Sequence, residues 1–146
     1  MSSPTTQLQR FYWSSLVSYL DENDLDLRRP RVQSAGWVPI SLGRSGFKIC
    51  LKVNTVAQNI AVELYIDHQD AQLMFNKLKL DQATIEQETG LTLDWQELPN
   101  RHACRIEFVR DNSSLSEQSL WPEYIKWHIE VATKFYQAFE RRVLAL

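Results

Sequence analysis

Residues 47–66 of the chain read FKICLKVNTVAQNIAVELYI, and this stretch decides the fold. Apolar residues alternate with other residues over 47–54, and the same period of two returns over 60–67. Because successive side chains of a strand point to opposite faces, each half predicts a β-strand with one apolar and one more polar face. The segment 55–59 predicts a turn, so the two strands are expected to form an antiparallel pair.

A shorter alternating stretch comes before this pair. Val38, Ile40 and Leu42 occupy every second position, which predicts another strand with its apolar face on the same side. The sequence Gly-Arg-Ser-Gly at 43–46 then predicts a tight hairpin turn, because glycine adopts backbone angles that other residues avoid. The three strands together indicate an antiparallel meander.

Helical spacing marks both ends of the chain. Over 4–22 apolar residues recur at intervals of three and four, and Pro4, after Ser2 and Ser3, suits the first turn of a helix. Pro122 likewise begins a long terminal helix, whose apolar residues cover more than half of its circumference. So wide a stripe is expected to be buried against the sheet and against a second helix or a partner.

The middle of the chain changes between helix and strand signals. Residues 70–89 predict one helix, which Gly90 is expected to end. Two strands are expected next, over 91–95 and over 104–108, with a turn at 99–100 between them. The order helix, three strands, helix, two strands, helix predicts an α+β fold, an antiparallel sheet of about five strands with the helices on one face.

Composition limits the class of protein. The 146 residues, 44% of them hydrophobic, suffice for one buried core, and no repeat divides them, so 1–146 are expected to form a single domain. With 16 Lys and Arg against 18 Asp and Glu, the net charge of −2 provides no overall attraction for a polyanion. No membrane span or secretory signal is visible, so a soluble, cytoplasmic protein is expected. Cys50 and Cys104 form no CxxC pair and are expected to stay reduced.

Several stretches together carry a resemblance to a known family. They are FYW at 11–13, ISLGRSGF at 40–47, VELYI at 62–66, LDWQELP at 93–99, CRI at 104–106 and WPEYI at 121–125, followed by Trp127, Phe135, Phe139 and Arg142. In this order and spacing they resemble the bacterial domain-of-unknown-function family 4268, over about residues 8–142. The resemblance implies an α+β module that in relatives commonly follows a nuclease-like domain of the PD-(D/E)XK type, in defence or DNA-processing systems. It implies no catalytic residues.

The chemistry of such a nuclease is not visible in this chain. A PD-(D/E)XK site needs two acidic metal ligands and a Lys two residues after the second, and no Asp or Glu here precedes a Lys at that spacing. The histidines His68, His102 and His128 stand beside no nucleophile motif. We therefore expect a non-enzymatic accessory module without a cofactor, whose partner is a nuclease-type protein or a second copy of the chain. An independent enzyme is the least favoured class.

Two motifs admit both a chemical and a structural interpretation. Arg44, within the glycine turn 43–46, could help to hold a phosphate, but a phosphate loop leads into a helix and this turn leads into a strand, so a hairpin is favoured. Asp67, His68 and Asp70 are ligand types that a divalent metal uses. Because they lie where a strand passes into a helix, an Asp N-cap is favoured and no metal site is predicted.

The more polar face of the predicted sheet is the candidate binding surface. Its candidate residues are Trp37, Lys48, Lys52 and Tyr65 on that face, Arg44 at a nearby turn, and Arg105 if its strand keeps the register. Aromatic rings interleaved with cations stack bases and contact phosphates in sheet-surface nucleic-acid binders. Glu63, and Glu107 if it shares the face, would dilute the positive potential. Contact with nucleic acid through this face is therefore the alternative to a protein-interaction role.

Overall fold

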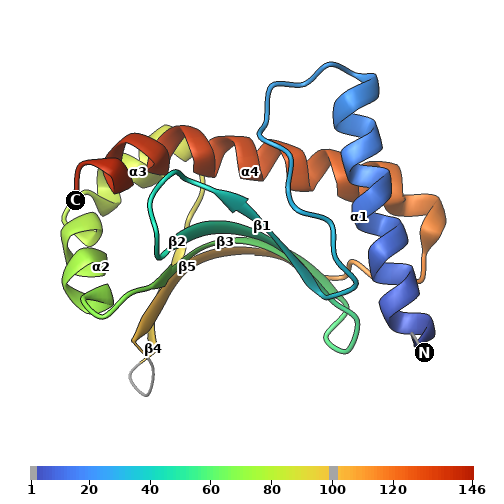
Figure 1. Cartoon of the computed structure of the whole chain (residues 1–146), viewed down its shortest axis with the longest axis horizontal. Coiled ribbons are helices and arrows are strands. Elements are labelled where there is room, and N and C mark those ends of the chain that lie inside the picture. The colour runs from blue at the N-terminus through green and yellow to red at the C-terminus, as the bar shows by residue number, and fades with distance from the viewer. Residues whose placement is uncertain (1–2, 99–101) are drawn as a thin grey trace.

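The structure is a computed structural model that describes residues 3–98 and 102–146. Five strands form one antiparallel sheet in the spatial order β1-β2-β3-β5-β4 (Figure 1). The strands are β1 (Trp37–Ser41), β2 (Phe47–Asn54), β3 (Asn59–Asp67), β4 (Asp94–Leu98) and β5 (Ala103–Arg110). The helices are α1 (Pro4–Glu22), α2 (Ala71–Lys79), α3 (Gln82–Thr89) and α4 (Trp121–Leu144), with a short 3₁₀ turn at Gln118–Leu120. The predicted α+β class and element order are confirmed, while Ser2 and the turn expected at 99–100 lie outside the described residues.

The sheet is arched, and its two sides differ. In Figure 1 the helix α4 runs along the convex side of the sheet. The helix α1 crosses α4 near one end of the sheet, and α2 and α3 lie towards the other end. No described helix covers the concave side. The helices thus lie on one face of the sheet, as the sequence predicts.

The apolar face predicted from the alternation lies beneath the helices. Ile49, Leu51 and Leu64 are fully buried there, and Phe135 and Phe139 of α4 are fully buried with them in one core. The helix α4 packs against β2 and β3 and also contacts α1 and α3. Its wide apolar stripe is therefore buried largely within the chain itself, against the sheet and two other helices.

The β1–β2 hairpin has the glycine turn that the sequence predicts. Gly43 and Gly46 have φ angles of +83° and +89°, a region that other residues rarely adopt. A Cβ atom on Gly46 would lie 2.9 Å from the backbone oxygen of Asp67, and the amide of Asp67 donates to the oxygen of Gly46 at 2.8 Å. The turn is thereby fixed against the end of β3.

The helix predicted over 70–89 is two helices, which corrects the expectation. The chain bends at Leu80 and Asp81, so α2 lies on β3 and β5 while α3 lies beside α4. Leu78 and Ile85, the buried residues on either side of the bend, are seven residues apart. Seven residues are close to two helical turns, so the apolar periodicity continues across the bend and does not reveal it.

Two local details also differ from expectation. The strand β4 begins at Asp94, because the amide of Leu93 instead donates to Oε2 of Glu86 at 2.8 Å, which ties the preceding segment to α3. Asp70 does occupy the N-cap position of α2, but its side chain makes no cap hydrogen bond. Its own amide donates to Nδ1 of His68 at 3.0 Å, so the imidazole organises this turn.

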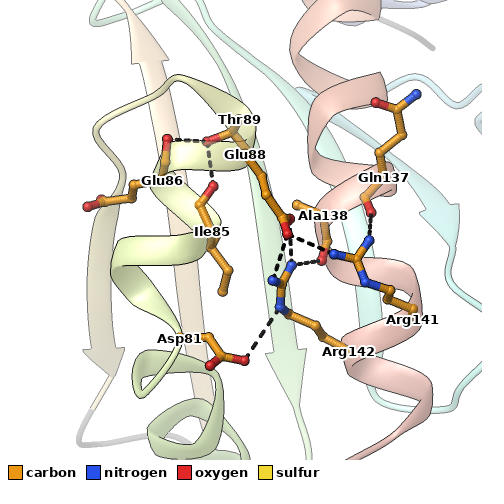
Figure 2. A network of polar contacts seen from close by, with 9 residues as sticks. All are labelled: Asp81, Ile85, Glu86, Glu88, Thr89, Gln137, Ala138, Arg141 and Arg142. Atoms are coloured by element: carbon orange, nitrogen blue, oxygen red, sulfur yellow. Dashed lines mark hydrogen bonds and ion pairs between the residues drawn. The ribbon is translucent and has the colours of Figure 1, made fainter.

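A cluster of ion pairs joins α3 to α4 (Figure 2). The guanidinium of Arg142 donates to both carboxylate oxygens of Glu88, at 2.8 and 3.0 Å, and Arg141 adds a third bond at 2.8 Å. Asp81 lies 3.6 Å from Nε of Arg142. The hydrogen bond from Arg142 holds the pKa of Glu88 below its usual value, with its positive charge acting in the same direction. These contacts fix the shorter helix against the longer one.

Both cysteines are free thiols and are buried, as expected. None of the described helices is both long enough and apolar enough to span a bilayer.

Candidate functional site

The concave face of the sheet carries the side chains that the sequence predicts for it. The strand register places Lys48, Tyr65 and Arg105 in one row across β2, β3 and β5. A second row contains Cys50, Glu63 and Glu107, and a third contains Trp37, Lys52 and Ala61. Arg105 keeps the register on which its placement depended, and Glu107 shares the face with Glu63.

The charges at the centre of this face are paired with one another. Nζ of Lys52 lies 2.5 Å from Oε2 of Glu107 and 3.3 Å from Oε1 of Glu63. Nε of Arg105 lies 3.1 Å from Oε2 of Glu63, and neither of these two atoms has a hydrogen-bond partner among the described residues. Glu63 and Glu107 are both buried. Two of the three predicted sheet-face cations are thus neutralised by carboxylates of the same face.

The carboxyl group of Glu63 is the most constrained member of this network. Burial raises its pKa, because the charged form loses water, and the nearby charge of Glu107 raises it further. Lys52 and Arg105 act in the opposite direction but do not cancel the effect of burial. Burial therefore disfavours the charged form of Glu63, and its two cationic neighbours favour it.

A pocket of about 260 Å³ opens beside the network. Its lining residues come from β1, β2, β3 and β5: Trp37, Lys48, Cys50, Glu63, Tyr65 and Arg105. Trp37 is 41% exposed, and Nζ of Lys48 lies 5.9 Å from the centroid of its ring, in cation–π range. The pocket thus combines exposed aromatic surface with hydrogen-bonding groups at its base.

The thiol of Cys50, which lines this pocket, is protonated at neutral pH. Burial, with a smaller contribution from Glu63, raises the pKa of its thiol to about 12, so the reactive thiolate is scarce. Within residues 3–98 and 102–146, no group of three His, Cys, Asp or Glu side chains is arranged to hold a metal ion. The arrangement can recognise a partner through contact and hydrogen bonding.

Four of the six candidate residues line the pocket, namely Trp37, Lys48, Tyr65 and Arg105. Lys52 lies next to it and is occupied by its carboxylate partners. Arg44 lies elsewhere: it donates to the backbone oxygens of Val143 and Leu146, at 2.9 and 2.7 Å. The hairpin turn reaches the end of α4, where backbone oxygens without helical partners need donors.

A second hollow, which we call the basic groove, lies between the segment 28–31 and the β1–β2 hairpin. It has a volume of about 550 Å³, and its cationic lining residues are Arg28, Arg29, Arg31, Arg44 and Lys48. Lys48 also lines the concave pocket, so the two hollows meet at its side chain. Arg28, Arg29 and Arg31 belong to the segment between α1 and β1, and no local sequence pattern indicates that this segment faces the hairpin.

The opposite side of the sheet holds a neutral polar network. His128 of α4 is fully buried, and its Nδ1 accepts a hydrogen bond from the Tyr12 hydroxyl at 2.6 Å. Its Nε2 then carries the proton and donates to the backbone oxygen of Lys52 at 3.0 Å. Burial lowers the pKa of His128 to about 4, so the ring is neutral at physiological pH. Both ring nitrogens are used structurally.

Fold and surface together define an α+β domain with a five-stranded antiparallel sheet, helices on one side, and a concave face with paired charges on the other. The sequence profile of the domain of unknown function DUF4268 matches residues 8–143, and the chain belongs to this family. No curated protein is similar enough in sequence to count as a relative.

Among solved structures, a chain of the HopA1–SchA chaperone–effector complex is similar to this chain, with a TM-score of 0.42 and 11% sequence identity. The similarity covers 83% of this chain and 95% of that one. At this level it transfers no property of that complex to the present domain.

Proposed function

We propose that this domain is a non-catalytic interaction module that docks a nuclease-type protein on the concave face of its sheet. The observation that carries the proposal is that this face is left open by the helices while its buried charges are already paired within the chain. A nuclease-type partner is the class that the family resemblance implies.

The chemistry of the face suits a protein partner. Trp, Tyr and Arg are enriched in protein–protein interfaces, and Trp37, Tyr65 and Arg105 lie together around the concave pocket. Because Glu63 and Glu107 are paired with cations, the face carries little uncompensated charge that a partner would have to neutralise. A surface of this kind favours contact and hydrogen bonding over attraction of a polyanion.

The other surface that the sequence suggested for docking is the terminal helix. Its apolar residues, including Tyr124, Phe135 and Phe139, are buried in the core of this same chain. The helix therefore has little of its predicted apolar stripe left for a partner, which favours the concave face.

The proposal is tested by calorimetric binding to the nuclease-type domain encoded next to, or in frame with, this chain. We expect Trp37→Ala and Tyr65→Ala each to weaken binding about tenfold or more, because aromatic anchors dominate such interfaces. Phe11→Ala is the matched control, since Phe11 is 68% exposed on α1, away from the concave face. Absence of binding by the unmodified chain, or equal losses in all three variants, would contradict the proposal.

A second copy of the chain is the other partner to be distinguished. Light scattering over a range of concentrations measures self-association. A dimer that Trp37→Ala dissociates and Phe11→Ala leaves intact would show that the concave face binds its own copy, and would replace the nuclease-type partner.

Nucleic acid on the sheet face is the second candidate function. The proximity of Lys48 to the exposed Trp37 ring favours it, because a base could stack there beside a cation. The ion pairs of Lys52 and Arg105 weaken it. Binding of an oligonucleotide that falls when Lys52 and Arg105 are both replaced by Ala would support this candidate over the protein-docking role.

A further inference from the structure

We infer that the basic groove binds the phosphate groups of a single-stranded nucleic acid, at a site distinct from the centre of the concave face. The inference stands on the groove itself and does not depend on the proposed protein-docking role. It rests on three features of the groove: its charge, its shape and its border with an exposed aromatic ring.

The charge of the groove contrasts with that of the chain. The whole sequence has a net charge of −2, yet the groove is lined by five cationic side chains and, among the described residues, by no Asp or Glu. Arg29 is offset by Asp21, whose Oδ1 lies 2.8 Å from its Nε, and Arg44 is committed to the end of α4. Arg28, Arg31 and Lys48 therefore provide the charge that is available to a ligand.

No carboxylate among the described residues pairs with these three side chains. The guanidinium of Arg28 donates to a neutral group, the backbone oxygen of Ser41, at 3.1 Å. Arg31 and Lys48 form no ion pair with any described residue, and both are exposed. On the sheet face, by contrast, Lys52 and Arg105 are both paired. Uncompensated positive charge is thus concentrated in the groove.

The walls of the groove are held in place by the backbone. The amide of Arg31 donates to the oxygen of Pro39 at 3.2 Å, so the arginine segment is attached to the outer edge of β1. On the other wall, Gly46 is packed tightly against Asp67. A preformed hollow of about 550 Å³ lies within the size range of ligand sites, and guanidinium groups bind phosphate oxygens in a bidentate manner.

The border of the groove distinguishes a nucleic acid from other anions. Lys48 lines both hollows, and its neighbour Trp37, which lines the concave pocket, is 41% exposed. A strand whose phosphates lie along Arg28, Arg31 and Lys48 would bring a base within reach of the indole ring. Stacking on an aromatic face requires an unpaired base, which favours a single strand over a duplex. An acidic peptide would use the charges but would gain no such stacking.

The test is fluorescence anisotropy with a labelled thymidine oligonucleotide of about 12 nucleotides, a length typical of single-strand sites. We expect the unmodified chain to bind at about 50 mM salt and to release the strand as salt is added, because phosphate contacts release counterions. The double variant Arg28→Ala/Arg31→Ala should bind at least about tenfold more weakly and show a salt slope smaller by about two contacts.

The matched control is the double variant Lys77→Ala/Lys126→Ala, which removes the same charge from exposed positions on α2 and α4. Its affinity for the oligonucleotide should be within about twofold of that of the unmodified chain, because both lysines lie outside the groove. Circular dichroism of both double variants verifies that each is folded, and Lys48→Ala provides a groove variant outside the arginine segment.

Three results would overturn the inference. The first is no binding of the oligonucleotide at low salt, and the second is equal weakening of binding by the groove and control variants. The third is binding of poly-glutamate as tight as that of the oligonucleotide, which would assign the groove to acidic peptides. The protein-docking role is judged separately, because Tyr65→Ala should weaken protein binding and Arg28→Ala/Arg31→Ala should leave it intact.

Discussion

The helix-covered side and the open concave side of the sheet hold their polar groups in different ways. Beneath the helices, His128 is neutral and makes hydrogen bonds through both ring nitrogens. On the concave side, Glu63 and Glu107 are paired with cations. Lys52 takes part in both arrangements, since its backbone oxygen accepts from His128 and its ammonium contacts both carboxylates.

This difference follows from burial. A polar group that is fully buried away from water must be neutral or completely paired. Under α4, the buried polar group is accordingly a neutral imidazole whose two ring nitrogens both make hydrogen bonds. The concave side keeps contact with solvent: the side chains of Lys52 and Arg105 are 27% and 24% exposed, so charged pairs are tolerated there. Substitutions on each side of the sheet distinguish the two arrangements.

The largest expected effect lies on the covered side. His128→Ala removes a fully buried ring and leaves the Tyr12 hydroxyl and the Lys52 oxygen without their partner. We expect the free energy of unfolding to fall by about 4 kcal/mol, measured by urea denaturation. His102→Ala is the control, because His102 is exposed, and it should change stability by less than about 0.5 kcal/mol. Equal effects of the two variants would contradict the structural role of His128.

The two sides of the sheet should contribute to the pH dependence of folding stability with opposite signs. The pKa of His128 is about 4 in the folded chain against an ordinary value of 6.5, so between these values the unfolded chain binds the extra proton. Folding is therefore weakened by this group as pH falls from 6.5 towards 4, by up to about 3 kcal/mol. The raised pKa of Glu63 acts the other way, since the folded chain binds its proton first as pH falls.

Urea denaturation of the unmodified chain and of a His128→Gln variant over pH 4 to 6.5 separates these contributions. The variant should lose the decline in stability towards low pH that His128 causes. An unchanged slope in the variant would show that His128 is not held neutral by its surroundings.

A smaller effect is expected from the concave side. Glu63→Gln leaves Arg105 without its carboxylate, while Lys52 keeps Glu107. We expect a change of no more than about 1 kcal/mol, because loss of the ion pair with Arg105 is offset by removal of the buried charge that raises the pKa of Glu63. Thermal denaturation measures the change, and Glu117→Gln, at an exposed position, is the control. A loss as large as that of His128→Ala would remove the contrast between the two sides.

The smallest effect is expected at the α3–α4 contact, which lies outside both sides of the sheet. Glu88→Gln weakens the bonds to Arg141 and Arg142 that Figure 2 shows, and the Glu88 side chain is 34% exposed. Because salt screens exposed charges, its effect on the melting temperature should be smaller than that of Glu63→Gln and should decrease further at high salt. A salt-independent effect would indicate a contact more buried than the structure shows.

The sequence predicts the sheet and its two faces because their signal is local. Alternation over 47–66 fixes which side chains share a face, and the antiparallel register then brings Lys48, Tyr65 and Arg105 into one row. The bend at Leu80 and Asp81 escapes prediction because the helical phase continues across it.

Other parts of the site depend on contacts that are distant in the sequence. Arg44 meets the end of α4 about a hundred residues later, and no local pattern announces that contact. The basic groove likewise needs the segment 28–31 to lie beside the hairpin turn, which chain topology decides. The pairing of Lys52 with Glu63 and Glu107 could be anticipated from the register, but its completeness depends on the side-chain geometry.

The most direct test of the account is hydroxyl-radical footprinting of the chain alone and with the proposed nuclease-type partner. In the free chain, the exposed residues Trp37 and Phe11 should both be oxidised. In the complex, Trp37 and Tyr65 should be protected while oxidation of Phe11 is unchanged, because the partner covers the concave face. Protection of Phe11 with Trp37 and Tyr65 still oxidised would contradict the assignment of the concave face as the docking surface.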